Sequence, residues 1–185
     1  MKFTRTGIEG CVIIEPRVFG DERGYFCETF RESDAAALAE AAGLAEAPRF
    51  IQDNESKSSY GVVRGLHFQK GEAAQAKLVR AVRGRVLDVA VDLRPGSATY
   101  GKHVAVELSE DNHLQFFIPR GFAHGYAVLS EEALFQYKCD NYYCPEAEGG
   151  IAWNDPDVAI NWTLPESDII LSEKDRNRIT LKELI

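Results

Sequence analysis

Short apolar runs alternate with polar and turn residues along most of the chain, and this pattern predicts strands rather than helices. Beyond Lys77 the apolar runs follow one another at nearly regular spacing, with Gly, Pro, Asp, Asn or Ser between them. Such spacing is typical of an antiparallel sandwich or barrel, because each break can hold a turn that joins two strands. The expected strands cover residues 78–82, 86–93, 103–108, 114–118, 126–129 and 134–137. We therefore expect an all-β fold, an antiparallel jelly-roll (cupin-like) barrel with a few short helices.

The first third of the chain predicts two more strands before this regular part. Residues 12–19 indicate a strand at an edge or bend, because Pro16 cannot donate a ladder hydrogen bond. The polar residues 21–24 can form a turn, and residues 25–30 then form the second strand. Residues 55–60 are polar, so we expect a loop there.

One helix is clearly predicted, and a second is expected near the end. Ser33 can cap a helix that continues through an Ala-rich run to Leu44, and Gly43 can close it. A short terminal helix is expected to begin near Ser172. No repeat, low-complexity tract or linker divides the chain, so residues 1–185 are expected to form a single domain.

Composition narrows the classes of function. The 185 residues are 45% hydrophobic and 27% charged, as in an ordinary globular protein, and the net charge of -8 argues against a nucleic-acid surface. Neither a membrane-spanning run nor the apolar stretch of a signal peptide is found, so we expect no membrane contact and a cytoplasmic location. The cysteines are expected to be buried, reduced thiols: Cys11, Cys27, Cys139 and Cys144.

Three potential cations lie close together in and after the half-buried strand predicted for residues 63–69. Arg64 and His67 lie within it, and Lys77 begins the next strand. Burying these groups is costly unless an anion lies among them, so an anionic ligand is the simplest partner. Because side chains alternate along a strand, His67 and Lys77 can enter one barrel cavity from different strands.

Other residues add candidates, and each has a structural alternative. His124 follows a turn and begins a strand, and Tyr137 shares a strand face with Phe135, so both can point into the barrel. Taken singly, a strand histidine is often a hydrogen-bonded structural residue and a strand tyrosine a core aromatic. Asp175 matches a capping box and can be explained by a helix start. Asp88 and Asp92 alternate with apolar residues, which a solvated strand face would explain.

A metal site is not expected in the barrel. A metal centre of the cupin type needs two histidines flanking one residue, with a carboxylate and a third histidine further on. The strand of residues 63–69 offers only His67, and Lys77 stands near the place of the carboxylate, where its charge would repel a divalent ion. We therefore expect neither a metal nor another cofactor.

Several segments, taken in order, carry a family resemblance. They are residues 21–28, 64–69, 77–79, 88–94, 119–125, 137–138, 153–156 and 172–175. Together they resemble the dTDP-4-dehydrorhamnose 3,5-epimerases, which are cupin-type jelly-roll isomerases of deoxysugar and rhamnose biosynthesis. The resemblance covers nearly the whole chain. It implies a metal-free barrel whose interior is lined by cations and histidines.

The resemblance also implies a reaction. The substrate would be dTDP-4-dehydro-6-deoxy-D-glucose, and inversion of carbons 3 and 5 through an enolate would give dTDP-4-dehydro-L-rhamnose. On the family pattern His67 is the base and Asp175 its partner. Tyr137 is the proton donor, and Lys77 is the cation beside the developing enolate oxygen.

Further matching positions imply how the substrate is held. Arg23 and Arg64 resemble the diphosphate contacts, Tyr143 resembles the aromatic residue that stacks on thymine, and His124, oriented by Asp88, would hold the sugar. The other matching binding positions are Phe26, Glu28, Gln52, Asn54, Glu148 and Lys174. In this family the early strands commonly cross to a partner subunit, which implies a homodimer.

Three alternatives stay open from the sequence. Mono-epimerases that invert only carbon 3 or only carbon 5 keep the same base, acid and lysine, so the residues do not separate them from a double epimerase. A metal-dependent cupin enzyme is a second class, and a barrel that binds a sugar nucleotide without catalysis is a third.

Overall fold

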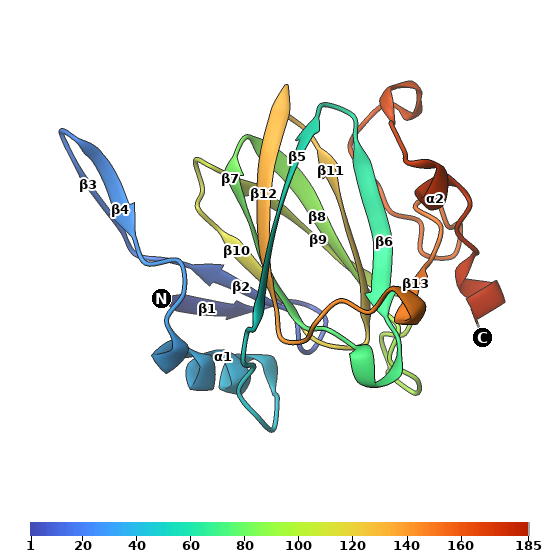
Figure 1. Cartoon of the computed structure of the whole chain (residues 1–185), viewed down its shortest axis with the longest axis horizontal. Helices are drawn as coiled ribbons and strands as arrows, with labels where there is room; N and C mark the ends of the chain where they lie inside the picture. Colours follow the sequence, from blue (N-terminus) through green and yellow to red (C-terminus); the bar gives the residue numbers. More distant parts are fainter. Residues whose placement is uncertain (185) are drawn as a thin grey trace.

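Two antiparallel sheets face each other in the computed structural model, which describes residues 1–184 (Figure 1). Across the first sheet the order is β1 (Lys2–Arg5), β2 (Val12–Glu15), β10 (Gln115–Ile118), β7 (Lys77–Arg83), β12 (Glu132–Cys139) and β5 (Gln52–Ser59). Across the second it is β13 (Glu148–Gly150), β6 (Val63–Gln69), β11 (Phe122–Val128), β8 (Arg85–Asp92) and β9 (His103–Ser109). This arrangement confirms the predicted all-β jelly-roll barrel. Ile185, the last residue of the predicted domain, lies outside the described residues.

The remaining elements lie outside the two sheets. They are the hairpin of β3 (Val18–Asp21) and β4 (Gly24–Cys27), the helices α1 (Ala35–Ala42) and α2 (Glu173–Arg176), and the 3-10 turns Glu32–Asp34, Gly71–Ala73, Pro145–Ala147, Glu166–Asp168 and Leu181–Leu184. The hairpin projects away from the barrel (Figure 1). No helix within residues 1–184 has the length and apolar character needed to cross a membrane.

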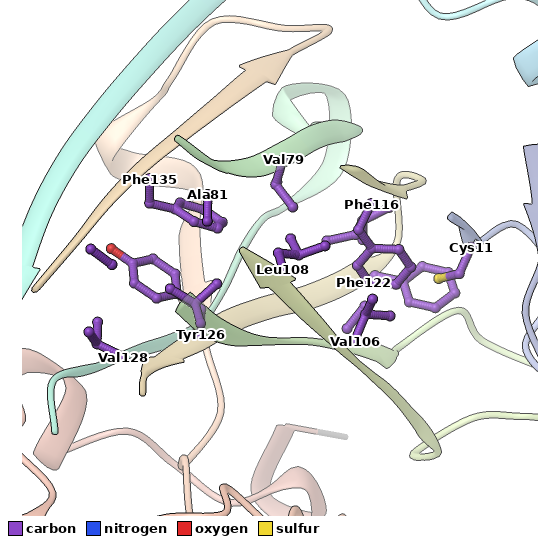
Figure 2. Close-up of a cluster of buried hydrophobic side chains, with 14 of the residues drawn as sticks. Cys11, Val79, Ala81, Val106, Leu108, Phe116, Phe122, Tyr126, Val128 and Phe135 are labelled. Atoms are coloured by element: carbon purple, nitrogen blue, oxygen red, sulfur yellow. The ribbon is translucent and has the colours of Figure 1, made fainter. Parts of the chain in front are cut away.

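The alternation along the strands builds the core between the sheets. Val86 and Ala90 of β8 point inward with Phe135 of β12, Phe116 of β10 and Tyr126 of β11. Figure 2 shows this cluster, in which the rings of Tyr126 and Phe135 stack with centroids 4.2 Å apart. Because aromatic side chains bury large apolar areas, these rings contribute much of the stability of the barrel.

Each sheet also buries its outer face. Helix α1 places Leu38 and Ala42 on the first sheet against Leu78 and Phe117. The C-terminal segment covers the second sheet, where Trp162 packs with its apolar outward residues. This cover brings α2 beside β6 (Figure 1), which matters for the site described below.

Two strand predictions need correction. The strand predicted for residues 12–19 is two strands, because the chain leaves the first sheet at Pro16 and continues in the hairpin. The loop predicted for residues 55–60 is wrong, since β5 pairs along its whole length with β12 at the edge of the first sheet. An edge strand with a solvated face accepts polar residues, which hid this strand from the hydrophobic pattern.

The helices largely follow their predictions. α1 begins after Asp34 rather than Ser33, and neither residue caps it through its side chain. Gly43 ends it with φ of 69°, a left-handed conformation that glycine adopts without strain. α2 begins after Ser172 as expected, and the Ser172 hydroxyl accepts a hydrogen bond from the Asp175 amide.

The cysteines agree with the prediction in part. All are free thiols, and Cys11 and Cys139 are buried. Cys27 and Cys144 are partly exposed, so the expectation of burial is wrong for these two. Burial raises the pKa of the Cys139 thiol to about 11, which keeps it protonated and poorly reactive.

The core packing predicts a large effect at Phe116. Phe116→Ala should lower the free energy of unfolding by about 3 to 5 kcal/mol, because its side chain is 0% exposed and its removal leaves a cavity. Tyr142→Ala is the control, since that ring is 66% exposed. Urea denaturation of both variants measures the difference, and equal losses would contradict this account of the core.

Candidate active site

A cavity of about 350 Å³ opens between the two sheets and is lined by several of the predicted residues. Its lining includes Gln52, Asn54, His67, Gln69, Gln75, Lys77, Tyr137, Tyr143 and Glu148. His67 comes from β6 of the second sheet, whereas Lys77 and Tyr137 come from β7 and β12 of the first. The cavity therefore receives a histidine from one sheet and an ammonium and a phenol from the other.

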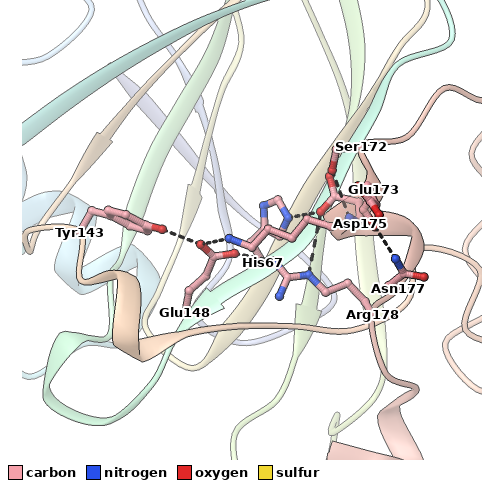
Figure 3. A network of polar contacts seen from close by, with 9 residues as sticks. His67, Tyr143, Glu148, Ser172, Glu173, Asp175, Asn177 and Arg178 are labelled. Carbon is pink, nitrogen blue, oxygen red and sulfur yellow. Dashed lines mark hydrogen bonds and ion pairs between the residues drawn. The ribbon is translucent and has the colours of Figure 1, made fainter.

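His67 and Asp175 form a hydrogen-bonded pair at the edge of this cavity (Figure 3). The carboxylate accepts from Nε2 of the imidazole, so this nitrogen carries the proton and Nδ1 keeps a lone pair. The Asp175 side chain is 6% exposed and that of His67 is 34% exposed. Asp175 also lies in the first turn of α2, where its amide donates to the hydroxyl of the capping residue Ser172 at 3.1 Å. Asp175 therefore stabilises the first turn of α2 through its amide and orients His67 through its carboxylate.

The Asp175 carboxyl stays ionised in this setting. Burial raises its pKa, but the hydrogen bond and charge of His67, together with the Ser172 hydrogen bond and the charge of Arg178, outweigh burial and hold the pKa below its ordinary value. An ionised carboxylate on Nε2 fixes the tautomer and leaves Nδ1 as the nitrogen that can accept a proton. The pair thus has the arrangement of a general base and its orienting group.

Lys77 and Tyr137 are neighbours on the first sheet and line the cavity opposite His67. The β7–β12 register pairs Tyr137 with Val79, and the Lys77 ammonium is 6.0 Å from the centre of the Tyr137 ring. Burial raises the pKa of Tyr137 to about 12, so its hydroxyl remains a proton donor at neutral pH. Burial lowers the pKa of Lys77, and the charges of Asp88 and Glu148 oppose that shift. A desolvated cation is thereby held beside a phenolic donor.

A second histidine–aspartate pair lies deeper in the barrel. Nε2 of His124 is 2.8 Å from Oδ2 of Asp88, and the Asp88 side chain is 0% exposed. Burial raises the pKa of Asp88 and lowers the pKa of His124. Within residues 1–184 the other Asp88 oxygen has no hydrogen-bond partner. The solvated strand face considered for Asp88 and Asp92 is wrong, because both point into the barrel and are fully buried.

Asp92 has a structural task instead. Its carboxylate accepts hydrogen bonds from Arg94, Ser97 and Thr99 and so ties down the loop between β8 and β9. Its backbone partner in β11 is Phe122, two residues before His124. The two aspartates of β8 share a strand face but differ in role.

Glu148 gathers three donors at the mouth of the cavity (Figure 3). It accepts from the Tyr143 hydroxyl at 2.6 Å, from the Lys174 ammonium at 2.6 Å and from the Arg178 guanidinium. Burial raises the pKa of Glu148, but these three donors outweigh it and lower the pKa to about 2. A firmly ionised carboxylate therefore fixes Tyr143 and Lys174 beside the cavity.

Other predicted binding residues lie around this mouth. Gln52 donates to Asn54 at 3.1 Å and accepts from the Tyr143 amide at 3.0 Å. The Arg64 guanidinium is exposed to solvent and donates to the Ser58 hydroxyl at 3.0 Å. These groups leave several polar atoms facing the open end of the barrel.

Three predicted binding residues lie apart from the cavity of their own chain. Arg23, in the turn of the projecting hairpin, pairs with Asp21 and is 84% exposed. Phe26 is 65% exposed, and the Glu28 carboxylate is 3.5 Å from Arg31. The fold of a single chain therefore does not bring these side chains to His67.

The sequence profile described as dTDP-4-dehydrorhamnose 3,5-epimerase matches residues 5–183, nearly the whole chain. The chain belongs to the dTDP-4-dehydrorhamnose 3,5-epimerase family. This finding confirms the resemblance seen in the sequence.

Individual members of the epimerase family are also close in sequence and structure. The dTDP-4-dehydrorhamnose 3,5-epimerase of Escherichia coli K12 is 55% identical over 100% of this chain and 97% of its own length. The crystal structure of the enzyme of that name from Elizabethkingia anophelis has a TM-score of 0.92 at 57% identity, with 99% and 97% of the two chains covered. A Legionella pneumophila epimerase, crystallised in complex with dTDP-4-keto-L-rhamnose, has a TM-score of 0.91 at 47% identity, covering 100% and 94%.

Sequence reasoning missed three residues in and behind this epimerase-family cavity. Gln69 and Gln75 line it, and the side-chain oxygen Oε1 of Gln69 accepts from the Cys144 amide at 2.9 Å. Arg178 joins Glu148 to the Asp175 region from the C-terminal segment. Their only signal in the sequence is that each lies near a predicted site residue. Gln69 is two positions from His67, Gln75 is two positions from Lys77, and Arg178 is three positions from Asp175.

The low pKa of Glu148 predicts how stability depends on pH. Its ordinary value of 4.5 falls to about 2 on folding, so its stabilisation is present above pH 4.5 and is lost as pH falls through about 2. Glu148→Gln should lower the free energy of unfolding by about 1 to 3 kcal/mol at neutral pH.

Urea denaturation across the pH range measures this effect. The gap between wild type and Glu148→Gln should narrow below pH 4.5 and close near pH 2. Glu131→Gln, in the exposed turn between β11 and β12, is the control and should show no such gap. A gap for Glu148→Gln that is independent of pH would contradict the ionic network.

Proposed function

We propose that the chain converts dTDP-4-dehydro-6-deoxy-D-glucose to dTDP-4-dehydro-L-rhamnose by inverting carbons 3 and 5, without a metal. The observation that carries the proposal is the placement of His67 and Tyr137 in one cavity on opposite sheets. Inversion of a carbon needs a base on one face and a proton donor on the other. Membership of the epimerase family supplies the substrate class.

His67 takes the proton from carbon in this proposal. Nε2 is bound to Asp175, so Nδ1 accepts the proton and the imidazolium formed is stabilised by the buried carboxylate. The electron pair left behind moves into the carbonyl group at carbon 4 and gives an enolate. Because both carbon 3 and carbon 5 flank that carbonyl, the same chemistry serves both positions.

Lys77 and Tyr137 complete each inversion. The Lys77 ammonium stabilises the enolate oxygen, which is worth a few kcal/mol in a cavity that excludes water. Tyr137 then gives its proton to carbon from the opposite face, and its pKa of about 12 keeps it protonated until an enolate needs it. His124, held by Asp88, binds the sugar beside them.

The nucleotide half of the substrate lies at the mouth of the cavity. Arg64 and Lys174 are near enough to the opening to contact the diphosphate, and Tyr143, which is 50% exposed and held by Glu148, offers a ring on which thymine stacks. Gln52 and Asn54 bind the nucleotide from β5. A local cationic surface thus receives an anionic substrate in an acidic protein.

A homodimer completes the site in this proposal. Arg23, Phe26 and Glu28 lie on or beside a hairpin that projects from its own barrel and exposes Phe19 and Tyr25. Exposed aromatic residues on a projecting hairpin favour burial against another chain. The hairpin reaches the cavity mouth of the partner, where Arg23 contacts the diphosphate.

The chain works as one domain in the cytoplasm. The sheets share a single core, and the C-terminal segment supplies Asp175 to a histidine of the barrel. Cys27 and Cys144 are free although partly exposed, which fits a reducing compartment.

The direct test is incubation with dTDP-4-dehydro-6-deoxyglucose in deuterated buffer with a chelator, followed by NMR. We expect deuterium at both carbon 3 and carbon 5, because each inversion passes through an enolate that takes a solvent-derived proton. Deuterium at one carbon alone would indicate a mono-epimerase. Binding without any exchange would indicate a non-catalytic barrel, and restoration of activity only by added metal would indicate a metal-dependent cupin.

His67→Ala tests the base. It should lower the exchange rate by roughly 100- to 10,000-fold at both carbons, since a positioned base contributes that much. His103→Ala removes a histidine from β9, outside the cavity lining, and should leave the rate unchanged. Retained exchange in folded His67→Ala would assign the base to another residue.

Mixed dimers test the crossing hairpin. Arg23→Ala and His67→Ala chains should each be inactive, but their heterodimer should regain about half of the wild-type activity, because one site then has both residues. A mixture of His67→Ala and Asp175→Asn is the control, since every site keeps one lesion. No recovery in a verified Arg23→Ala/His67→Ala heterodimer would contradict the crossing.

A further inference from the structure

Arg178 lies next to Asp175 of the His67–Asp175 pair (Figure 3). Its side chain is 13% exposed, and one end of its guanidinium donates to Glu148. Its Nε is 3.9 Å from Oδ1 of Asp175, the same oxygen that His67 binds. The Arg178 guanidinium therefore contacts the Glu148 carboxylate and also approaches the Asp175 carboxylate, which is the partner of the proposed base.

The Arg178 Nε has no hydrogen-bond partner within residues 1–184, although it is buried. Buried N–H groups are nearly always paired, so an unpaired one needs an explanation. The 3.9 Å separation from Asp175 is beyond hydrogen-bond length, and His67 already occupies that oxygen. Arg178 thus acts on Asp175 through its charge and does not compete with His67 for the carboxylate.

The neighbouring strand leaves room for this cation. A Cβ at Gly150 would lie 2.7 Å from the Arg178 Nε and 2.7 Å from the Leu66 backbone oxygen, so a larger residue there would clash with both the arginine and β6. Gly150 is also the backbone partner of His67 in the β13–β6 ladder. The guanidinium therefore fills the space next to the strand position that carries the base.

We propose that Arg178 is a positioning residue, which holds the Asp175 carboxylate toward His67 and balances its charge so that the imidazole releases its proton again. This inference rests on the proposed role of His67 as the base. A lone buried carboxylate would stabilise the imidazolium strongly and would slow the return of the proton. A cation at 3.9 Å offsets part of that attraction.

Other charged and titratable groups around the His67–Asp175 pair also influence its protonation. Asp175 faces His67 of β6 and Arg178, with the Ser172 hydroxyl at its own helix start. His67 lies opposite His124 of β11 in the ladder, and Lys77 of β7, Tyr137 of β12 and Glu148 of β13 share its cavity. Arg64 and Lys174 line a second pocket with His67 and Asp175, and Lys77 lies in the main cavity. Arg178 is the cation in ion-pair contact with Asp175, at 3.9 Å.

Arg178→Gln tests the inference through the pH profile of kcat/KM for exchange. Loss of the cation makes the pair hold its proton more tightly, so the acidic limb should move to higher pH by roughly 0.5 to 1 unit. Arg178→Lys keeps the charge and should keep the limb within about 0.2 units of wild type. Arg176→Gln removes the same charge from the exposed side of α2 and should change neither limb nor rate.

A second variant guards against misfolding. Arg178→Gln leaves Glu148 without one of its partners, whereas Glu148→Gln combined with Arg178→Gln removes both members of the pair and costs less stability. The acidic limb of the double variant should also move to higher pH, by a smaller amount, because the cation removed is the one beside Asp175.

The outcomes separate this inference from the proposed function. A wild type that shows no exchange overturns both. An active wild type, with a folded Arg178→Gln or double variant whose acidic limb stays within about 0.2 units, overturns the role of Arg178 alone. A lower rate shared equally by Arg178→Gln and Arg178→Lys, without movement of the limb, would show that Arg178 has only a packing role.

Discussion

The hydrogen bond between His67 and Asp175 is the interaction on which the rest of the site depends. It joins the centre of a barrel strand to a four-residue helix, 108 positions later in the chain. The helix can reach the strand only because the C-terminal segment packs its apolar residues on the outer face of the second sheet. Burial of Trp162 and its neighbours thus supplies the free energy that holds a carboxylate beside the proposed base.

Charge pairing explains how an acidic chain keeps basic groups around the cavity. Asp88 lies behind His124, Glu148 behind Lys174, and Asp175 behind His67, so each of these three basic groups has a buried or half-buried carboxylate partner. Such pairing offsets the cost of removing charges from water and fixes where each donor points. These paired side chains are therefore oriented before any ligand binds, which is the condition for electrostatic catalysis.

Much of the fold follows from the sequence, and the exceptions have physical reasons. Regular apolar runs located the strands from β7 to β12, and Ser172 located α2, because alternation and capping are local properties. β5 was missed since its polar residues satisfy an edge strand as well as a loop. In the site, alternation predicted inward positions for His67 and Lys77, but the partner of each charge is set by tertiary packing. Asp88 and Arg178 show this limit, as neither burial nor contact is visible in their local sequence.

We propose that Asp175 fixes the tautomer of His67 and leaves Nδ1 free to act as the base. Long-range proton–nitrogen NMR on histidine-labelled protein in alkaline buffer tests it most directly, with the His67 signals assigned by their absence in His67→Ala. We expect a proton on Nε2 and none on Nδ1, and loss of this preference in Asp175→Asn. A His67 that carries its proton on Nδ1 in the wild type would contradict the proposed role of Asp175.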